Sequence, residues 1–135
     1  MRLLPDTNLL VYDTVENSEN HNDAAKIIDE AEKIIVPSIV IHEYIWVMLR
    51  VVQAPLSFIA FKVCEYLEDP RVIYMLETAD VIVGALKMLE ENKEDSREIN
   101  DYIILAMALR QKSTLATFDQ KLRKKALEKG LEVAP

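Results

Sequence analysis

The stretch Ile34-Ile35-Val36-Pro37-Ser38-Ile39-Val40-Ile41-His42-Glu43 decides the fold, because it has the pattern of a strand that leads directly into a helix. Branched apolar residues favour an extended strand, and Pro37 ends it because proline cannot donate a ladder hydrogen bond. Ser38 is a residue type that often caps a helix N-terminus, and apolar residues then recur at helical spacing to about Gln53. The pattern predicts one strand–helix unit.

The same alternation continues in both directions along the chain. Further strands are predicted at 3–4, 72–76, 114–117 and 131–133, and further helices at 20–33, 56–68, 78–92, 99–111 and 119–130. The strand at 72–76 is mostly apolar and is expected to be covered on both faces. Strands interleaved with helices predict a parallel sheet with right-handed crossovers and helices on both faces. We therefore expect an α/β protein with a three-layer α/β/α arrangement around a parallel sheet of four to five strands.

The bulk composition is that of one small domain. A chain of 135 residues, half of them hydrophobic, suits a single domain over 1–135 with its own core. The one cysteine, Cys64, excludes an internal disulfide, suits a reducing compartment, and is predicted to be a small core residue. The apolar runs are too short to span a bilayer, and Asp6 follows the N-terminus too closely for a signal peptide. These features predict a cytoplasmic protein with no membrane partner.

The formal net charge of −7 argues against a broad surface that coats nucleic acid. Carboxylates gathered around divalent cations escape that objection, because the bound ions reverse the local sign of the charge. The net charge therefore excludes neither a nuclease nor a non-nuclease.

Four acids are predicted at one edge of the sheet. Asp6 follows the first strand, Glu43 lies early in the helix after the second strand, Asp101 opens a helix, and Asp119 follows the strand at 114–117. In open α/β folds the ligand site lies outside the carboxyl ends of the strands, which is where these residues are expected to converge.

Each acid also has a structural interpretation. Asp101 and Asp119 have the positions of helix-capping carboxylates, and Glu43 has the position of a solvated residue on a helix face. Four carboxylates at one edge, however, repel one another and destabilise the fold unless a cation neutralises them. Oxygen ligands without clustered His or Cys favour one or two Mg²⁺ or Mn²⁺ ions over zinc.

The four acids lie in segments that resemble the motifs of PIN domains. The segment 6–12, Asp-Thr-Asn followed by an apolar run, is similar to the opening motif of the family, and 40–45 is similar to its second motif, a helical Glu among apolar residues. Segments 100–106 and 117–122 resemble the third and fourth motifs in the same order. The resemblance covers essentially the whole chain. The length of the chain also resembles that of the VapC toxins of type II toxin–antitoxin pairs.

The resemblance implies a metal-dependent endoribonuclease that hydrolyses phosphodiester bonds of single-stranded RNA. Asp6 and Asp101 would be direct metal ligands, and Glu43 and Asp119 would complete the cluster directly, through waters, or by orienting the attacking water. Asn8 and Thr117 would hold Asp6 and Asp119 in place, although Asn8 has the alternative role of satisfying the turn after Asp6. The family also implies a homodimer and a small antitoxin that covers the acidic groove.

Two other groups of residues have competing interpretations. The basic residues of the last helix would position the RNA backbone, or would form a solvated face with cations favourable to the helix dipole: Lys121, Arg123, Lys124 and Lys125. The apolar run 44–49 is predicted to be buried, with Trp46 and Val47 alternatively in a dimer interface or an antitoxin groove. His42 adjoins Glu43, but neighbouring positions on a helix point about 100° apart, so His42 is interpreted as a packing residue rather than a general base.

Three alternatives to the toxin remain. A phosphoacceptor receiver domain would also gather acids around Mg²⁺, but it needs a lysine at the end of its last strand, and 131–135 contains none. A PIN-like interaction protein without catalytic activity would keep the same fold. A PIN-domain nuclease of RNA processing or quality control would keep the chemistry and change the biological role.

Overall fold

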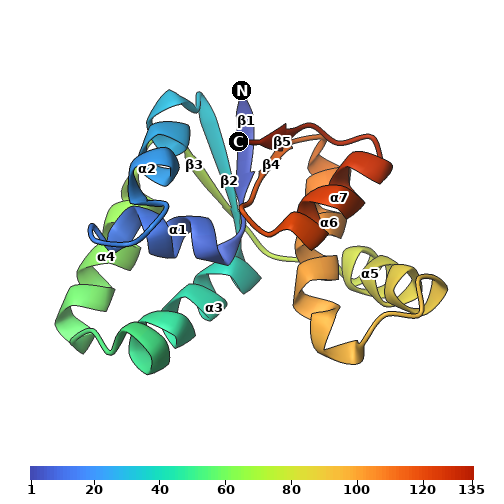
Figure 1. Ribbon diagram of the computed structural model, residues 1–135, viewed down its shortest axis with the longest axis horizontal. Helices are drawn as coiled ribbons and strands as arrows, with labels where there is room; N and C mark the ends of the chain where they lie inside the picture. Colours follow the sequence, from blue (N-terminus) through green and yellow to red (C-terminus); the bar gives the residue numbers. More distant parts are fainter.

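All five strands pair in parallel, in the spatial order β3-β2-β1-β4-β5. The computed structural model describes residues 1–135, and its strands are β1 (Arg2–Pro5), β2 (Lys33–Pro37), β3 (Val72–Met75), β4 (Thr114–Ala116) and β5 (Val133–Ala134). In Figure 1, helices α1 to α4 lie on one side of the strands and α5 to α7 on the other. The predicted three-layer α/β/α fold with a parallel sheet is confirmed, and the sheet has five strands.

Seven α-helices and two short helical segments connect the strands. Their bounds are α1 (Thr7–Thr14), α2 (His21–Glu30), α3 (Ser38–Val47), α4 (Leu56–Glu68), α5 (Ala79–Glu91), α6 (Ile99–Gln111) and α7 (Gln120–Glu128), with a π-helical segment η1 (Met48–Val52) and a 3₁₀ turn η2 (Ser96–Glu98). No helix combines the length and the hydropathy that crossing a membrane requires.

Strand β1 lies at the centre of the sheet and ends where the first acid begins. Leu3 and Leu4 are fully buried, and Leu4 pairs with Leu115 of β4. Pro5 is the last residue of β1, as its missing N–H predicts, and the ladder resumes with the Asp6 N–H donating to the Ala116 carbonyl at 2.9 Å. The parallel strands thus place the segments that follow β1, β2 and β4 at one edge (Figure 1).

Helix α3 begins at Ser38, but Ser38 does not cap it. The capping position is Pro37, and the Ser38 hydroxyl instead donates to both carboxylate oxygens of Glu77 at 2.8 Å. Glu77, in the loop after β3, also accepts from the Ile39 N–H at 3.3 Å. A carboxylate distant in sequence therefore satisfies the first turn of this helix.

Four burial predictions are wrong. Strand β3 was expected to be covered on both faces, but it is an edge strand with Ile73 and Tyr74 exposed. Cys64 is exposed on α4 instead of buried in the core. The run 44–49 is apolar but not wholly buried, because Tyr44 and Met48 face the core while Trp46 is 60% exposed. His42 is likewise exposed and is not a packing residue.

Candidate active site

Asp6 is the most firmly held of the four acids. It follows β1 directly, is buried, and occupies the N-cap position of α1. Its Oδ1 accepts a hydrogen bond from the Leu9 N–H at 2.9 Å, and its Oδ2 accepts one from the Thr117 hydroxyl at 2.5 Å. Both carboxylate oxygens are thus oriented by protein donors, one in α1 and the other directly after β4.

Glu43 lies on α3 and is held by two neutral donors. The Thr7 hydroxyl donates to Glu43 Oε1 at 2.8 Å, and the Asn100 amide donates to Oε2 at 3.0 Å. Thr7 is the residue after Asp6, and Asn100 is the residue before Asp101. These bonds connect the three segments that contain the first three acids.

Asp101 and Asp119 are less constrained. Asp101 lies in the first turn of α6, is half-buried, and accepts no hydrogen bond from a protein group. Asp119 caps α7, as predicted: its Oδ1 accepts from the Lys121 N–H at 2.9 Å and the Leu122 N–H at 3.1 Å, which leaves Oδ2 without a protein donor. The Asp119 N–H donates to the Thr117 hydroxyl at 3.0 Å, so this hydroxyl bridges Asp6 and Asp119.

The charges of the four acids influence one another. Burial raises the pKa of Asp6 to about 6, and the negative charges of Asp119 and Glu43 contribute, although the hydrogen bonds from Thr117 and Leu9 oppose the rise. Burial also raises the pKa of Asp101 to about 6, with further contributions from the charges of Asp119, Glu43 and Asp6. None of the four forms an ion pair with a Lys, Arg or His side chain.

The acid cluster, meaning Asp6, Glu43, Asp101 and Asp119, fits a hydrated divalent cation. Its donors are all carboxylate oxygens, and their negative charge has no protein cation to offset it. No three His, Cys, Asp or Glu side chains are arranged to hold one ion together. Such a site suits an ion that takes one or two carboxylates directly and keeps several waters, which is the coordination that Mg²⁺ prefers.

Comparison with known proteins decides the family. The sequence profile of the PIN domain matches residues 3–128, nearly the whole chain. The chain belongs to the PIN domain family. A search of curated proteins returns no match for the sequence.

Solved PIN-type structures share the fold of this PIN domain. The toxin VapC20 of Mycobacterium tuberculosis, which cleaves the sarcin–ricin loop, is similar with a TM-score of 0.82 and 17% identity over 98% of this chain and 99% of its own. VapBC2 of Rickettsia felis, bound to a promoter DNA fragment, is similar with a TM-score of 0.69 and 20% identity over 98% and 97%. FitAcB of Neisseria gonorrhoeae is similar with a TM-score of 0.63 and 17% identity over 98% and 96%. At these identities the likeness shows the fold.

The other predicted site residues of this PIN domain lie in different surroundings. Thr117 is fully buried and bonds to Asp6 as well as to Asp119. Asn8 is exposed and its side chain makes no hydrogen bond.

The predicted basic residues differ in whether their side chains are paired with other groups of the protein. Lys121 pairs with Glu94 at 3.0 Å and with Glu98, and Lys125 pairs with Glu94 at 2.8 Å. The Arg123 guanidinium donates to the Pro135 carbonyl, whereas Lys124 is exposed and unpaired.

Sequence reasoning missed Thr7 and Asn100. Both are adjacent to acids that it did select, but their hydrogen bonds run to Glu43, at a separation of 36 and 57 residues. It also missed Glu98, the last residue of η2, whose charge contributes to the raised pKa of Asp101. The available signal was that Thr7 and Asn100 lie within the motif segments 6–12 and 100–106 and that Glu98 lies two residues before the second of these.

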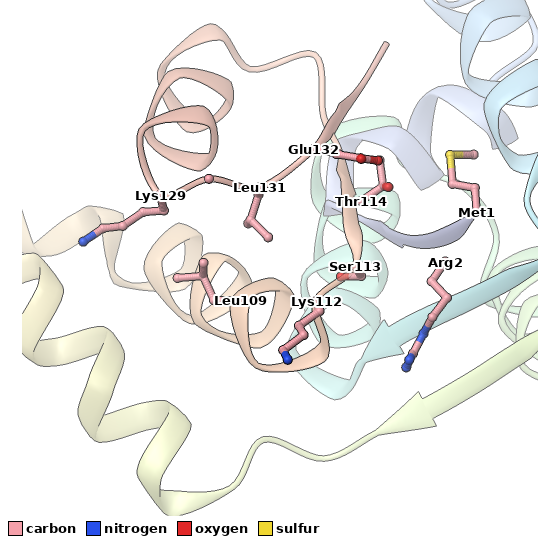
Figure 2. Close-up of a pocket in the computed structure, with 10 residues that line it drawn as sticks. Met1, Arg2, Leu109, Lys112, Ser113, Thr114, Lys129, Leu131 and Glu132 are labelled. Atoms are coloured by element: carbon pink, nitrogen blue, oxygen red, sulfur yellow. The ribbon is translucent and has the colours of Figure 1, made fainter.

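A cavity of about 540 Å³ at the opposite end of the sheet is a separate feature. Figure 2 shows its lining, which includes Arg2, Lys112, Lys129 and Glu132 but no member of the acid cluster. Lys112 and Lys129 are the C-cap residues of α6 and α7, where cations offset the partial negative charge of the helix ends. The positions of these two lysines therefore have a structural explanation.

Proposed function

We propose that this PIN domain is a Mg²⁺- or Mn²⁺-dependent endoribonuclease that hydrolyses phosphodiester bonds of single-stranded RNA, and that it is the toxin of a type II toxin–antitoxin pair. One observation supports it above the others. Four carboxylates, from the ends of β1 and β4, the second turn of α3 and the first turn of α6, meet at one sheet edge without a protein cation. In a protein that binds no metal, four unneutralised carboxylates at one edge would only destabilise the fold.

Some residues of the chain orient the carboxylates of this site, and others are left free to bind a ligand. Thr117 and the Leu9 N–H hold Asp6, and Thr7 and Asn100 hold Glu43, so these carboxylates keep their orientation while substrate binds. Asp101 and the free oxygen of Asp119 have no protein donors to release before they bind a ligand. A divalent cation bound here would neutralise phosphate charge and make water a better nucleophile.

The comparisons support the toxin role more than the alternatives. Among the similar structures are a toxin that cleaves the sarcin–ricin loop and a toxin–antitoxin complex from Klebsiella pneumoniae. We therefore propose an antitoxin that covers the acidic edge of this chain, and a homodimer as its assembly. A small antitoxin-like reading frame directly upstream would favour the toxin over an RNA-processing or quality-control nuclease. Sedimentation velocity of the purified protein tests the dimer.

The deciding experiment is a cleavage assay with fluorescent single-stranded RNA in Mg²⁺, in Mn²⁺ and in EDTA. Wild-type protein should cut only with metal, and Asp6→Asn and Asp101→Asn should each reduce the rate by roughly 100-fold or more. Asp23→Asn is the matched control, because Asp23 is an exposed α2 residue with no bonded partner. A wild type that neither cuts RNA nor binds Mn²⁺ would contradict the proposal, whereas Mn²⁺ binding without cleavage would indicate an inactive PIN-like module.

A further inference from the structure

Trp46 is a large aromatic side chain that the fold leaves in solvent beside the acid cluster. It is the only tryptophan of the chain and is 60% exposed. It lies three residues after Glu43 on α3, and residues at this spacing lie on the same side of a helix. Burial of the large apolar surface of an indole is normally favourable, and exposed apolar surface beside a polar site is characteristic of a binding surface.

A hollow of about 470 Å³ accompanies this side chain. It is lined by Ile39, His42, Glu43, Trp46, Val47 and Asn100. Five of these residues belong to α3, and Asn100 lies at the beginning of α6. The volume lies in the range of pockets that hold small ligands.

The hollow adjoins the acid cluster directly. Glu43 belongs to both, and the Asn100 amide in the hollow donates to Glu43 Oε2 at 3.0 Å. A polymer with one phosphate against the acid cluster would therefore place a neighbouring nucleotide over α3. Binding of a nucleotide in the hollow needs no second metal ion there.

The lining has the chemistry of a nucleobase site. An exposed indole offers a flat π-surface, and unpaired bases of RNA are recognised largely by stacking on aromatic side chains. Ile39 and Val47 add apolar contact, while the exposed His42 imidazole and the Asn100 carbonyl oxygen make no hydrogen bond within the protein. These two groups are available to the edges of a base.

We propose that Trp46 stacks on an unpaired base adjacent to the scissile phosphate, and that this hollow is the base subsite of the enzyme. The proposal rests on the proposed RNA-cleaving function and defines its substrate further, as RNA with an unstacked base beside the cleaved bond. The flat indole face and the unbonded polar groups of His42 and Asn100 favour a base over a protein partner as the occupant of the hollow. A partner is nevertheless an outcome that the experiment can detect.

The single tryptophan makes the subsite directly observable. In EDTA, where metal-dependent cleavage is blocked, a single-stranded RNA hexamer is titrated into wild-type protein and into Asp101→Asn, which carries less negative charge. Emission of Trp46 should be quenched saturably by the single strand, and much less by a duplex of the same sequence or by a hexamer with abasic positions. A gel of the same samples verifies that the RNA remains intact.

Variants measure how much the indole contributes. By anisotropy of fluorescein-labelled hexamer, Trp46→Ala should weaken binding about tenfold, and Trp46→Phe should restore most of the affinity because it retains an aromatic face. Phe61→Ala is the matched control, since Phe61 is an aromatic side chain on α4, 62% exposed and outside the hollow. It should bind as wild type does.

The outcomes separate the subsite from the function. RNA binding by anisotropy without any change in Trp46 emission would overturn the subsite, as would equal quenching by duplex and single strand. Emission that depends on protein concentration in the absence of RNA would instead assign the hollow to an interface with a second copy. Intact quenching without cleavage in Mn²⁺ would leave the base site and reject only the nuclease, whereas normal cleavage by Trp46→Ala would reject only the base site.

Discussion

The Thr117 hydroxyl connects the two acids that come from the ends of neighbouring strands. It donates to Asp6 Oδ2 and accepts from the Asp119 N–H, and Thr117 is fully buried. Thr117→Val should lower the free energy of unfolding by about 1 to 3 kcal/mol, because it leaves a buried carboxylate oxygen without its donor. Urea denaturation in EDTA measures this change.

The same substitution should also weaken metal binding. Loss of a hydrogen bond that orients a ligand typically reduces metal affinity by roughly 10- to 100-fold. Isothermal titration with Mn²⁺ measures the affinity, and Thr117→Ser should keep it because the serine hydroxyl can make both bonds. Thr114→Val is the control, since Thr114 begins β4, the strand that Thr117 follows, is half-buried and makes no side-chain hydrogen bond. An unchanged Mn²⁺ affinity in Thr117→Val would show that Asp6 is positioned by other means.

Helix α3 supplies Glu43 and the hollow beside it, and its first turn depends on Glu77. The Glu77 carboxylate accepts from the Ser38 hydroxyl and from the Ile39 N–H. Glu77→Ala should therefore cost about 1 to 2 kcal/mol of stability, because the first turn loses both a capping acceptor and a favourable charge. Glu91→Ala on exposed α5 surface is the control in the same denaturation series. Equal midpoints for the two variants would contradict a capping role.

The contact between Glu77 and the first turn of α3 shows which features of the fold cannot be predicted from sequence. The order of strands and helices, the sheet edge at which Asp6 and Asp119 meet, and the cap at Asp119 follow from local pattern and topology. Ser38 was predicted as a cap because its residue type and position are suitable, but Glu77 is 39 residues away and only the folded chain brings it to α3.

The burial of individual side chains was harder to predict for the same reason. The apolar run at β3 predicted a covered strand, yet the strand order places β3 at the edge. Trp46 lies in a run that is apolar on every side of the helix, so its periodicity could not predict which side is exposed. The bonds from Thr7 and Asn100 to Glu43 likewise depend on how three helices meet, which no local pattern records.

The whole molecule should respond to pH in a way that the acid cluster determines. The pKa values of Asp6 and Asp101 are raised to about 6 in the folded protein, whereas such groups titrate near 4 in unfolded chains. Between about pH 4 and pH 6 the folded state therefore binds more protons than the unfolded state, and the free energy of unfolding falls as the pH rises through this window. The destabilisation is fully present above pH 6 and absent below about pH 4.

Asp6→Asn tests this at the scale of the whole fold, because it removes one charge while leaving an acceptor for the Leu9 N–H and a donor toward Thr117. In EDTA at pH 7.5 the variant should be more stable than wild type by on the order of 2 kcal/mol, and the difference should vanish near pH 4. Mn²⁺ at pH 7.5 should reverse the ranking, since a ligand that binds only the folded wild type adds to its stability. Thermal and urea denaturation across this range measure both effects, with Glu16→Gln, an exposed acid outside the helices, as the control that should follow wild type. A difference between wild type and Asp6→Asn that is constant with pH would show that the charge of Asp6 is not what destabilises the metal-free fold.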